Sequence, residues 1–118
     1  MTPNESRWLR RWGWLQSGKR KVPVFIGKWP MQSQWGATYE DRVIVQWPMT
    51  RAKWEKTLVH EWIHNWIEDA GVMRMLKRVL GRYVAEDIEE KIVTKLAPVV
   101  LKALKAHGFQ FRYPGDEQ

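Results

Sequence analysis

The sequence predicts one α+β domain, in which a small antiparallel sheet packs on a motif-bearing helix and on a second long helix. The 118 residues are the size of a single domain, and 44% hydrophobic residues are enough to fill one core. Runs of β-branched and aromatic residues bounded by Gly and Pro occupy residues 22–47, which is typical of strands. Apolar residues at helical spacing dominate residues 50–106. Strands followed by helices indicate an α+β fold.

The N-terminal segment is basic and rich in tryptophan. Residues 1–29 contain seven Lys or Arg and one Glu, a net charge of +6, which is most of the +7 of the whole chain. Residues 5–16 predict a short helix with Trp8, Trp12 and Leu15 on one side.

The chain is predicted to have three parts: a basic Trp/Arg-rich arm at residues 1–21, a folded domain at residues 22–113 and a flexible tail at residues 114–118. Interleaved Arg and Trp can bind phosphates and stack on bases, so the arm is a candidate nucleic-acid interface. An anionic membrane surface is a second candidate. Alternatively, the arm packs its tryptophans on the domain and keeps its arginines in water.

Three strands are expected before the helices. The first is residues 22–26, where Pro23 cannot donate a ladder hydrogen bond and therefore favours an edge strand or a strand that begins there. Residues 34–39 and 42–47 predict two further strands joined at Glu40-Asp41.

Three helices are expected after the strands, over residues 50–69, 72–80 and about 84–106. Thr50 is a good N-cap for the first of them. Each helix is followed closely by a glycine that suits a helix end: Gly71, Gly81 and Gly108.

Composition excludes several classes of site. The chain has no cysteine, so disulfides, thiolate metal ligands and a cysteine nucleophile are excluded. No segment approaches the run of about 20 apolar residues that a membrane span needs. Residues 1–15 lack the apolar region of a secretory signal, so we expect a cytoplasmic protein.

The motif His60-Glu61-Trp62-Ile63-His64 reads H-E-x-x-H within the first predicted helix. Residues four apart share a helix face, so His60 and His64 can bind one metal ion. Glu61 can then reach a water molecule on that metal as a general base. This arrangement is typical of a zinc-dependent peptidase.

A catalytic zinc ion usually has a third protein ligand, for which Glu86, Glu89, Glu90 and His107 are candidates. Glu89 projects near the middle of the apolar stripe of the long helix, Glu86 nearer its edge and Glu90 outside it. A carboxylate on a buried face needs a partner such as a metal ion. We therefore rank Glu89 first, Glu86 second and Glu90 third. The stripe consists of Ile92, Val93, Leu96, Val100, Ala103 and Leu104.

A developing oxyanion requires a donor besides the metal. Tyr83, Tyr39 and His107 are candidates, and we rank Tyr83 first because it precedes the helix that carries the third ligand. His107 is otherwise explained as a histidine favoured at a helix C-terminus.

The segment from Thr57 to Trp66 resembles the active-site helix of zincin metallopeptidases. The run from Glu89 to Leu101 is similar to the second helix of small phage-encoded zincin-like proteins, which are distantly akin to ImmA/IrrE-type metallopeptidases of mobile elements. The resemblance covers roughly residues 34–106 and implies a minimal zincin in the cytoplasm of a phage or mobile-element host. It implies that His60 and His64 are zinc ligands, that Glu61 is the base, and that one glutamate of the Glu89–Glu90 pair is the third ligand.

The sequence thus favours a Zn²⁺-dependent metallopeptidase that hydrolyses protein or peptide substrates. The alternative is a nucleic-acid-associated binding protein in which the metal site is structural or vestigial.

Overall fold

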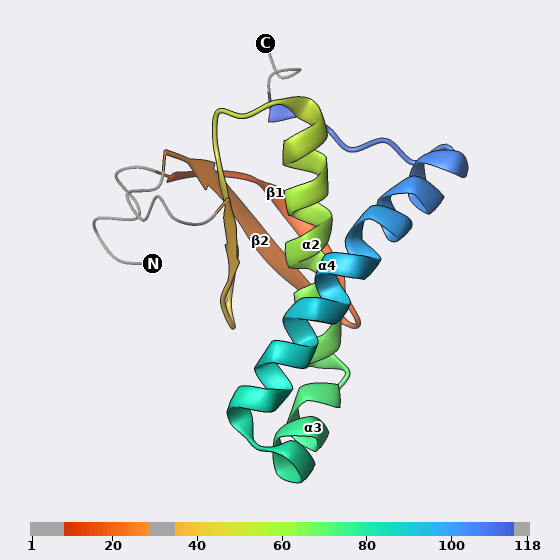
Figure 1. Ribbon diagram of the computed structural model, residues 1–118. Helices are drawn as coiled ribbons and strands as arrows, with labels where there is room; N and C mark the ends of the chain where they lie inside the picture. Colours follow the sequence, from red (N-terminus) through yellow and green to blue (C-terminus); the bar gives the residue numbers. More distant parts are fainter. Residues whose placement is uncertain (1–8, 29–34, 115–118) are drawn as a thin grey trace.

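The computed structural model describes residues 9–28 and 35–114, which form an α+β fold (Figure 1). Four strands precede three helices, and the α+β class predicted from the sequence is confirmed. The strands are β1 (Leu9–Ser17), β2 (Arg20–Gly27), β3 (Gly36–Thr38) and β4 (Val43–Gln46), and the helices are α2 (Arg51–Asp69), α3 (Val72–Leu80) and α4 (Arg82–Ala106).

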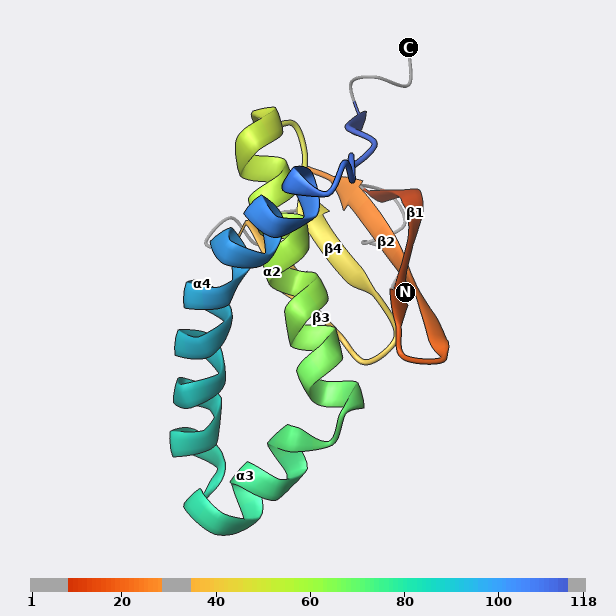
Figure 2. The same cartoon turned by 90° about the vertical axis from the view of Figure 1, so that its right-hand side faces the viewer.

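The sheet was predicted to be antiparallel, but it is mixed. Its strand order is β1-β2-β4-β3, and β2 and β4 run parallel, with Val24 opposite Val43 (Figure 2). The predicted pairing of β3 with β4 is correct, and their turn is closed by the amide of Tyr39 donating to the carbonyl of Arg42 at 2.8 Å. Because β3 takes the edge position beyond β4, β4 lies between β3 and β2 and shares the direction of β2.

The helix predicted for residues 5–16 is wrong over its described part, because residues 9–17 form β1 and pair with β2. Trp12 and Leu15 nevertheless share one side, since both are buried in the core. Residues three apart in a regular strand face opposite ways, but the register of β1 shifts between Arg11 and Gly13, and this irregularity brings both side chains to the core. Trp8 lies outside the described residues.

Pro23 is accommodated inside the sheet although β2 is not an edge strand. It lies opposite Trp14 of β1, and the pairing of β2 with β4 begins only at Val24. The missing N–H of Pro23 therefore falls where one side of β2 has no paired strand.

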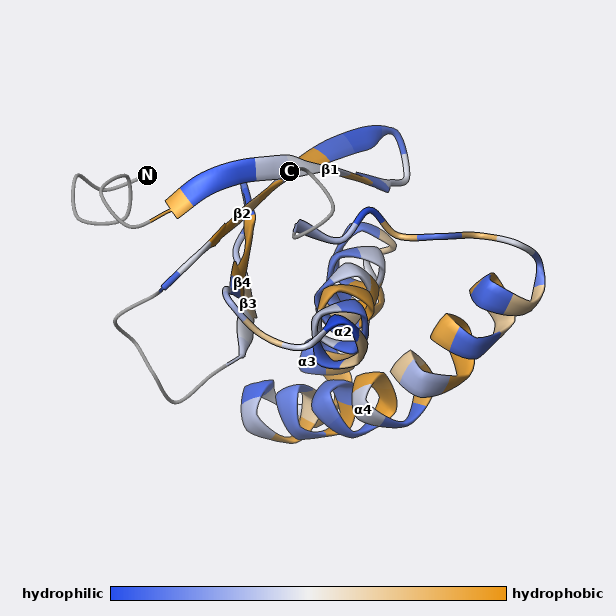
Figure 3. Cartoon of the chain, turned by 90° about the horizontal axis from the view of Figure 1, so that it is seen from above, coloured by the Kyte–Doolittle hydropathy of each residue, from blue (hydrophilic) through white to orange (hydrophobic). Residues whose placement is uncertain are grey.

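The three helices begin and end close to the predicted residues. The Thr50 side chain caps α2 by accepting from the amide of Lys53 at 3.3 Å. Gly71 and Gly81, both with positive φ, separate α3 from its neighbours. Helix α2 lies between the sheet and α4 (Figure 3), so its buried side chains contact both. None of the helices in the described part of the chain has the length and apolar content that a membrane span requires.

The core lies between the helices and the inner face of the sheet. Trp54 of α2 is fully buried, and the Trp12 ring meets it edge-on with centroids 4.9 Å apart. The segment after α4 packs back on this core, where Phe111 is buried and Trp12 Nε1 donates to the Arg112 carbonyl at 3.0 Å. These contacts fix α2 against the sheet and thereby position the motif helix.

Candidate metal site

The H-E-x-x-H motif opens onto a cleft bounded by β3, α2 and α4. The cleft has a volume of about 1920 Å³ and is lined by Thr38 of β3, by His60, Glu61 and His64 of α2, and by the glutamates of α4. Among the described strands only β4 pairs with β3, and all three residues of β3 line this cleft.

His60, His64 and Glu90 form one cluster of potential metal ligands. The His60 Nε2 atom lies 3.0 Å from one Glu90 oxygen, and His64 Nε2 lies 3.1 Å from the other. One ligand atom from each residue lies within 4.8 Å of the other two. The two imidazoles lie one turn apart on α2, with ring centroids 5.0 Å apart, and Glu90 approaches them from α4. Two neutral histidines and one carboxylate are a ligand set that suits catalytic zinc.

Glu89, the candidate that hydrophobic periodicity favours as the third ligand, lies at the other nitrogen of His64. Its Oε2 atom is 3.4 Å from His64 Nδ1, whereas Glu90 faces Nε2. The side chain of Glu89 is 17% exposed and that of Glu90 58% exposed. Periodicity therefore identified the more buried carboxylate, but the cluster forms at the margin of the helix interface. A carboxylate at the second nitrogen of a metal-binding histidine fixes the ring orientation and the tautomer.

Burial shifts the pKa values of two residues at this site, Glu89 and His60. Burial raises the pKa of Glu89, although the charge of nearby His64 opposes the shift. Burial also lowers the pKa of His60, against the attraction of Glu90. A neutral His60 is the form that binds a metal ion.

Glu61 is buried beside the cluster, with 6% of its surface exposed. The Thr38 hydroxyl lies 2.9 Å from Glu61 Oε2 and 3.1 Å from the Glu61 carbonyl oxygen. Burial raises the pKa of Glu61 to about 7, although nearby His64 and the Thr38 hydroxyl favour the charged form. A carboxyl group with a pKa near neutrality is suited to proton transfer.

Gly36 allows β3 to lie close against the motif helix. A Cβ atom at this position would come within 2.8 Å of Thr57 Cγ2 and within 3.1 Å of Glu61 Cγ. Only a residue without a side chain fits at this distance, so Gly36 sets the approach that brings Thr38 to Glu61.

We expect Gly36→Ala to lower the free energy of unfolding by about 1–3 kcal/mol, because the added methyl group overpacks the contact between β3 and α2. Denaturant unfolding measures the change. Thr57→Ser removes the nearest methyl group and keeps the hydroxyl that donates to the Lys53 carbonyl at 2.8 Å. Adding Thr57→Ser should therefore recover part of the loss. An unchanged stability of Gly36→Ala would contradict the close approach.

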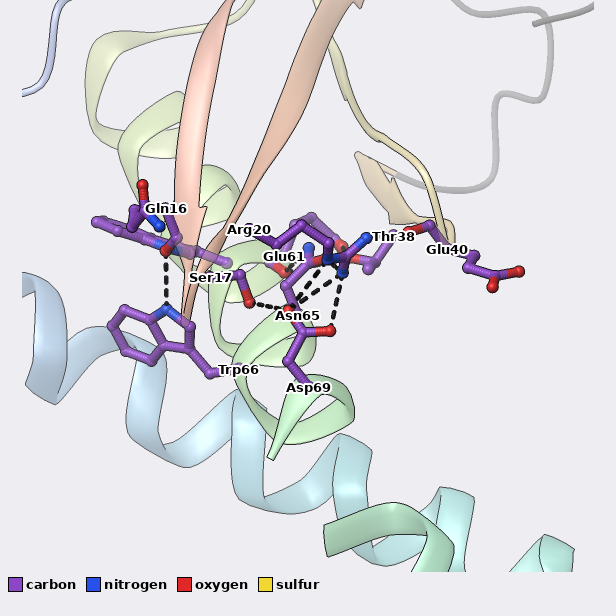
Figure 4. A network of polar contacts seen from close by, with 10 residues as sticks. Gln16, Ser17, Arg20, Thr38, Glu40, Glu61, Asn65, Trp66 and Asp69 are labelled. Carbon is purple, nitrogen blue, oxygen red and sulfur yellow. Dashed lines mark hydrogen bonds and ion pairs between the residues drawn. The ribbon is translucent and has the colours of Figure 1, made fainter. Parts of the chain in front are cut away.

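A polar network ties the two hairpin turns to the end of α2 (Figure 4). Arg20, at the start of β2, bonds to Asp69 at 2.9 Å and also donates to the Glu40 carbonyl. Asn65, which is fully buried, donates to the Glu61 carbonyl at 3.1 Å and accepts from Arg20 at 3.5 Å. The network therefore extends from both turns of the sheet to the backbone of the general-base candidate.

The other predicted candidates lie apart from the cluster. Tyr83 is 83% exposed and does not line the cleft, because it precedes Glu90 by seven residues, about 10 Å along the helix axis. Glu86 pairs with Arg82 at 3.0 Å on the surface, and His107 follows the last residue of α4 and is exposed. Tyr39 does line the cleft.

Several polar residues that were not among the predicted site residues also line the cleft, and they include Thr38, Lys56 and Arg74. Lys56 lies one turn before His60 on α2, and its charge lowers the pKa of His60. Helical spacing from His60 would have identified Lys56, but the other two depend on tertiary packing.

Comparison of the chain with protein-family models, with curated proteins and with solved structures finds no match. The geometry of the cleft is therefore the main indication of what the chain does.

Proposed function

We propose that the chain is a zinc-dependent metallopeptidase that acts on protein or peptide substrates. The observation that carries this proposal is the meeting of His60, His64 and Glu90 beside the buried carboxyl group of Glu61. This set lies in an open cleft, so it remains accessible to a substrate. A purely structural site for zinc would instead be closed.

His60, His64 and Glu90 would hold the metal, and Glu89 would orient the His64 ring. A bound zinc ion acidifies a water molecule and polarises the scissile carbonyl group. Glu61 takes a proton from the attacking water and later donates it to the nitrogen of the leaving amine. Thr38 holds the Glu61 carboxyl group in place for both transfers.

The edge of β3 away from β4, with which no other strand of residues 9–28 and 35–114 pairs, is suited to an extended peptide. Main-chain hydrogen bonds to this edge would place a peptide along the cleft, next to the histidines. Lys56, one turn before His60, offers a positive charge for the developing oxyanion.

The alternative function, nucleic-acid binding with a structural or vestigial metal site, has support from one feature of β1. The Arg11 guanidinium lies 4.6 Å from the centroid of the Trp14 ring, and Trp14 is half exposed. Such a pair can stack on bases. Under this alternative the acid–base chemistry of Glu61 has no role.

We expect the purified chain to bind one zinc ion and to cleave an unfolded protein substrate, because the cluster supplies three ligands and a base. Elemental analysis measures the zinc, and gel electrophoresis of the substrate measures cleavage before and after a chelator is added. The matched control is the His60→Ala/His64→Ala double variant, which should lose both properties. Absence of stoichiometric zinc in the wild type would contradict the proposal.

A further inference from the structure

Helix α3 and the first turn of α4 form an end of the molecule far from the sheet (Figures 1 and 2). Several apolar side chains at this end are exposed. Val72, Met75 and Val79 follow one stripe of α3 at positions i, i+3 and i+7, and Val79 is 73% exposed. Further exposed apolar residues surround the turn into α4. This group, which we call the tip, consists of Val72, Met75, Val79, Leu80, Tyr83 and Val84.

The segment that contains the tip also carries basic side chains, and its sequence has no acidic residue between Asp69 and Glu86. Arg82 pairs with Glu86 at the surface, whereas three other cations belong to α3 itself. These are Arg74, Lys77 and Arg78. An exposed helix that combines an apolar stripe with basic residues is typical of a segment at a membrane surface.

We propose that the tip docks onto an anionic lipid surface. The apolar side chains enter the boundary between headgroups and acyl chains, and the lysines and arginines contact the anionic headgroups. The protein would bind the membrane peripherally, because α3 would lie in the plane of the interface without crossing the bilayer. The inference does not depend on the metal site.

Other occupants fit the tip less well. Aliphatic side chains neither stack on bases nor bond to phosphates, so a nucleic acid would leave them in water. The tip's apolar residues line neither the main cleft, where the site lies, nor the smaller hollow near Lys105. A second copy of the chain would bring its own basic residues against these, and like charges repel.

Vesicle flotation tests the proposal. We expect the chain to float with vesicles made of two parts phosphatidylcholine and one part phosphatidylserine, and to float much less with phosphatidylcholine alone. Higher salt should weaken the binding, since exposed charges are screened. Failure to float with the anionic vesicles would overturn the proposal.

The chain carries a net charge of +7, so the test must locate the binding surface. Lys77→Glu/Arg78→Glu should weaken binding to the anionic vesicles by about tenfold or more. Lys19→Glu/Lys21→Glu makes the same change in net charge at the β1–β2 turn, and we expect no more than about a threefold effect. Equal effects of the two double variants would overturn the assignment to the tip.

The apolar contribution has its own pair of variants. Met75→Ser/Val79→Ser should weaken binding to the vesicles about tenfold. Val99→Ser, at an exposed position on α4 away from the tip, should not change the binding. Because the chain has no cysteine, Val79→Cys can carry a single environment-sensitive fluorophore. Its emission should shift to shorter wavelength on the vesicles, and the same label at Val99→Cys should not respond. Flotation without a shift at position 79, or tip variants that impair only binding to single-stranded DNA, would overturn the proposal.

Discussion

Glu61→Gln is expected to retain zinc and to lose peptidase activity by at least about a hundredfold. The amide has nearly the shape of the carboxyl group, and its oxygen can still accept from the Thr38 hydroxyl, so the cleft should keep its geometry. The amide cannot take a proton from water at neutral pH, so the acid–base step is lost while the metal ligands stay intact.

The initial rate of peptide cleavage and the zinc content together measure this outcome. Glu86→Gln is the matched control, because Glu86 pairs with Arg82 and is not among the residues that line the cleft. It should keep both activity and zinc. Full activity in Glu61→Gln would contradict the role of Glu61, and loss of zinc would show that the variant had disturbed the site itself.

The second prediction separates the two neighbouring glutamates of α4. Glu90→Ala should weaken zinc binding by more than about a hundredfold, because it removes a carboxylate that faces both Nε2 atoms. Glu89→Ala should weaken it by about 10- to 100-fold, because it removes only the partner of His64 Nδ1.

Competition with a chelator of known affinity measures the zinc dissociation constant of both variants. Their matched charge change makes each the control for the other. The reverse order of effects would show that Glu89 is the ligand that the hydrophobic pattern of α4 indicates, and that Glu90 belongs to the surface.

Much of the helical structure could be predicted because its signals are local. Thr50 caps α2 within one turn of its own position, and Gly71 and Gly81 break the chain where they stand. The motif likewise depends only on the periodicity of one helix, so the placement of His60 and His64 on one face follows from their spacing of four residues.

Local signals are insufficient where distant segments decide the structure. The irregularity in β1 gives Trp12 and Leu15 a helix-like spacing, and only pairing with β2 shows that they belong to a strand. The parallel pairing of β4 with β2 depends on where β3 lies in the sheet. Which of Glu89 and Glu90 faces both histidine Nε2 atoms depends on how α4 is rotated against α2, and hydrophobic periodicity alone does not give that rotation. The separation of Tyr83 from the cluster follows from the length of α4 that precedes Glu90.

His60 and Glu90 lie thirty residues apart along the chain, and the segment between them contains the whole of α3 with both of its turns. A metal ion held at both ends would close this segment into a ring, which reduces the number of conformations open to it when the helices separate. Opening the ring and releasing the ion then become one event, so tighter binding at the histidines means a rarer opening of the helical hairpin. The tip lies inside that ring, so a bound ion would also restrict the motion of the tip.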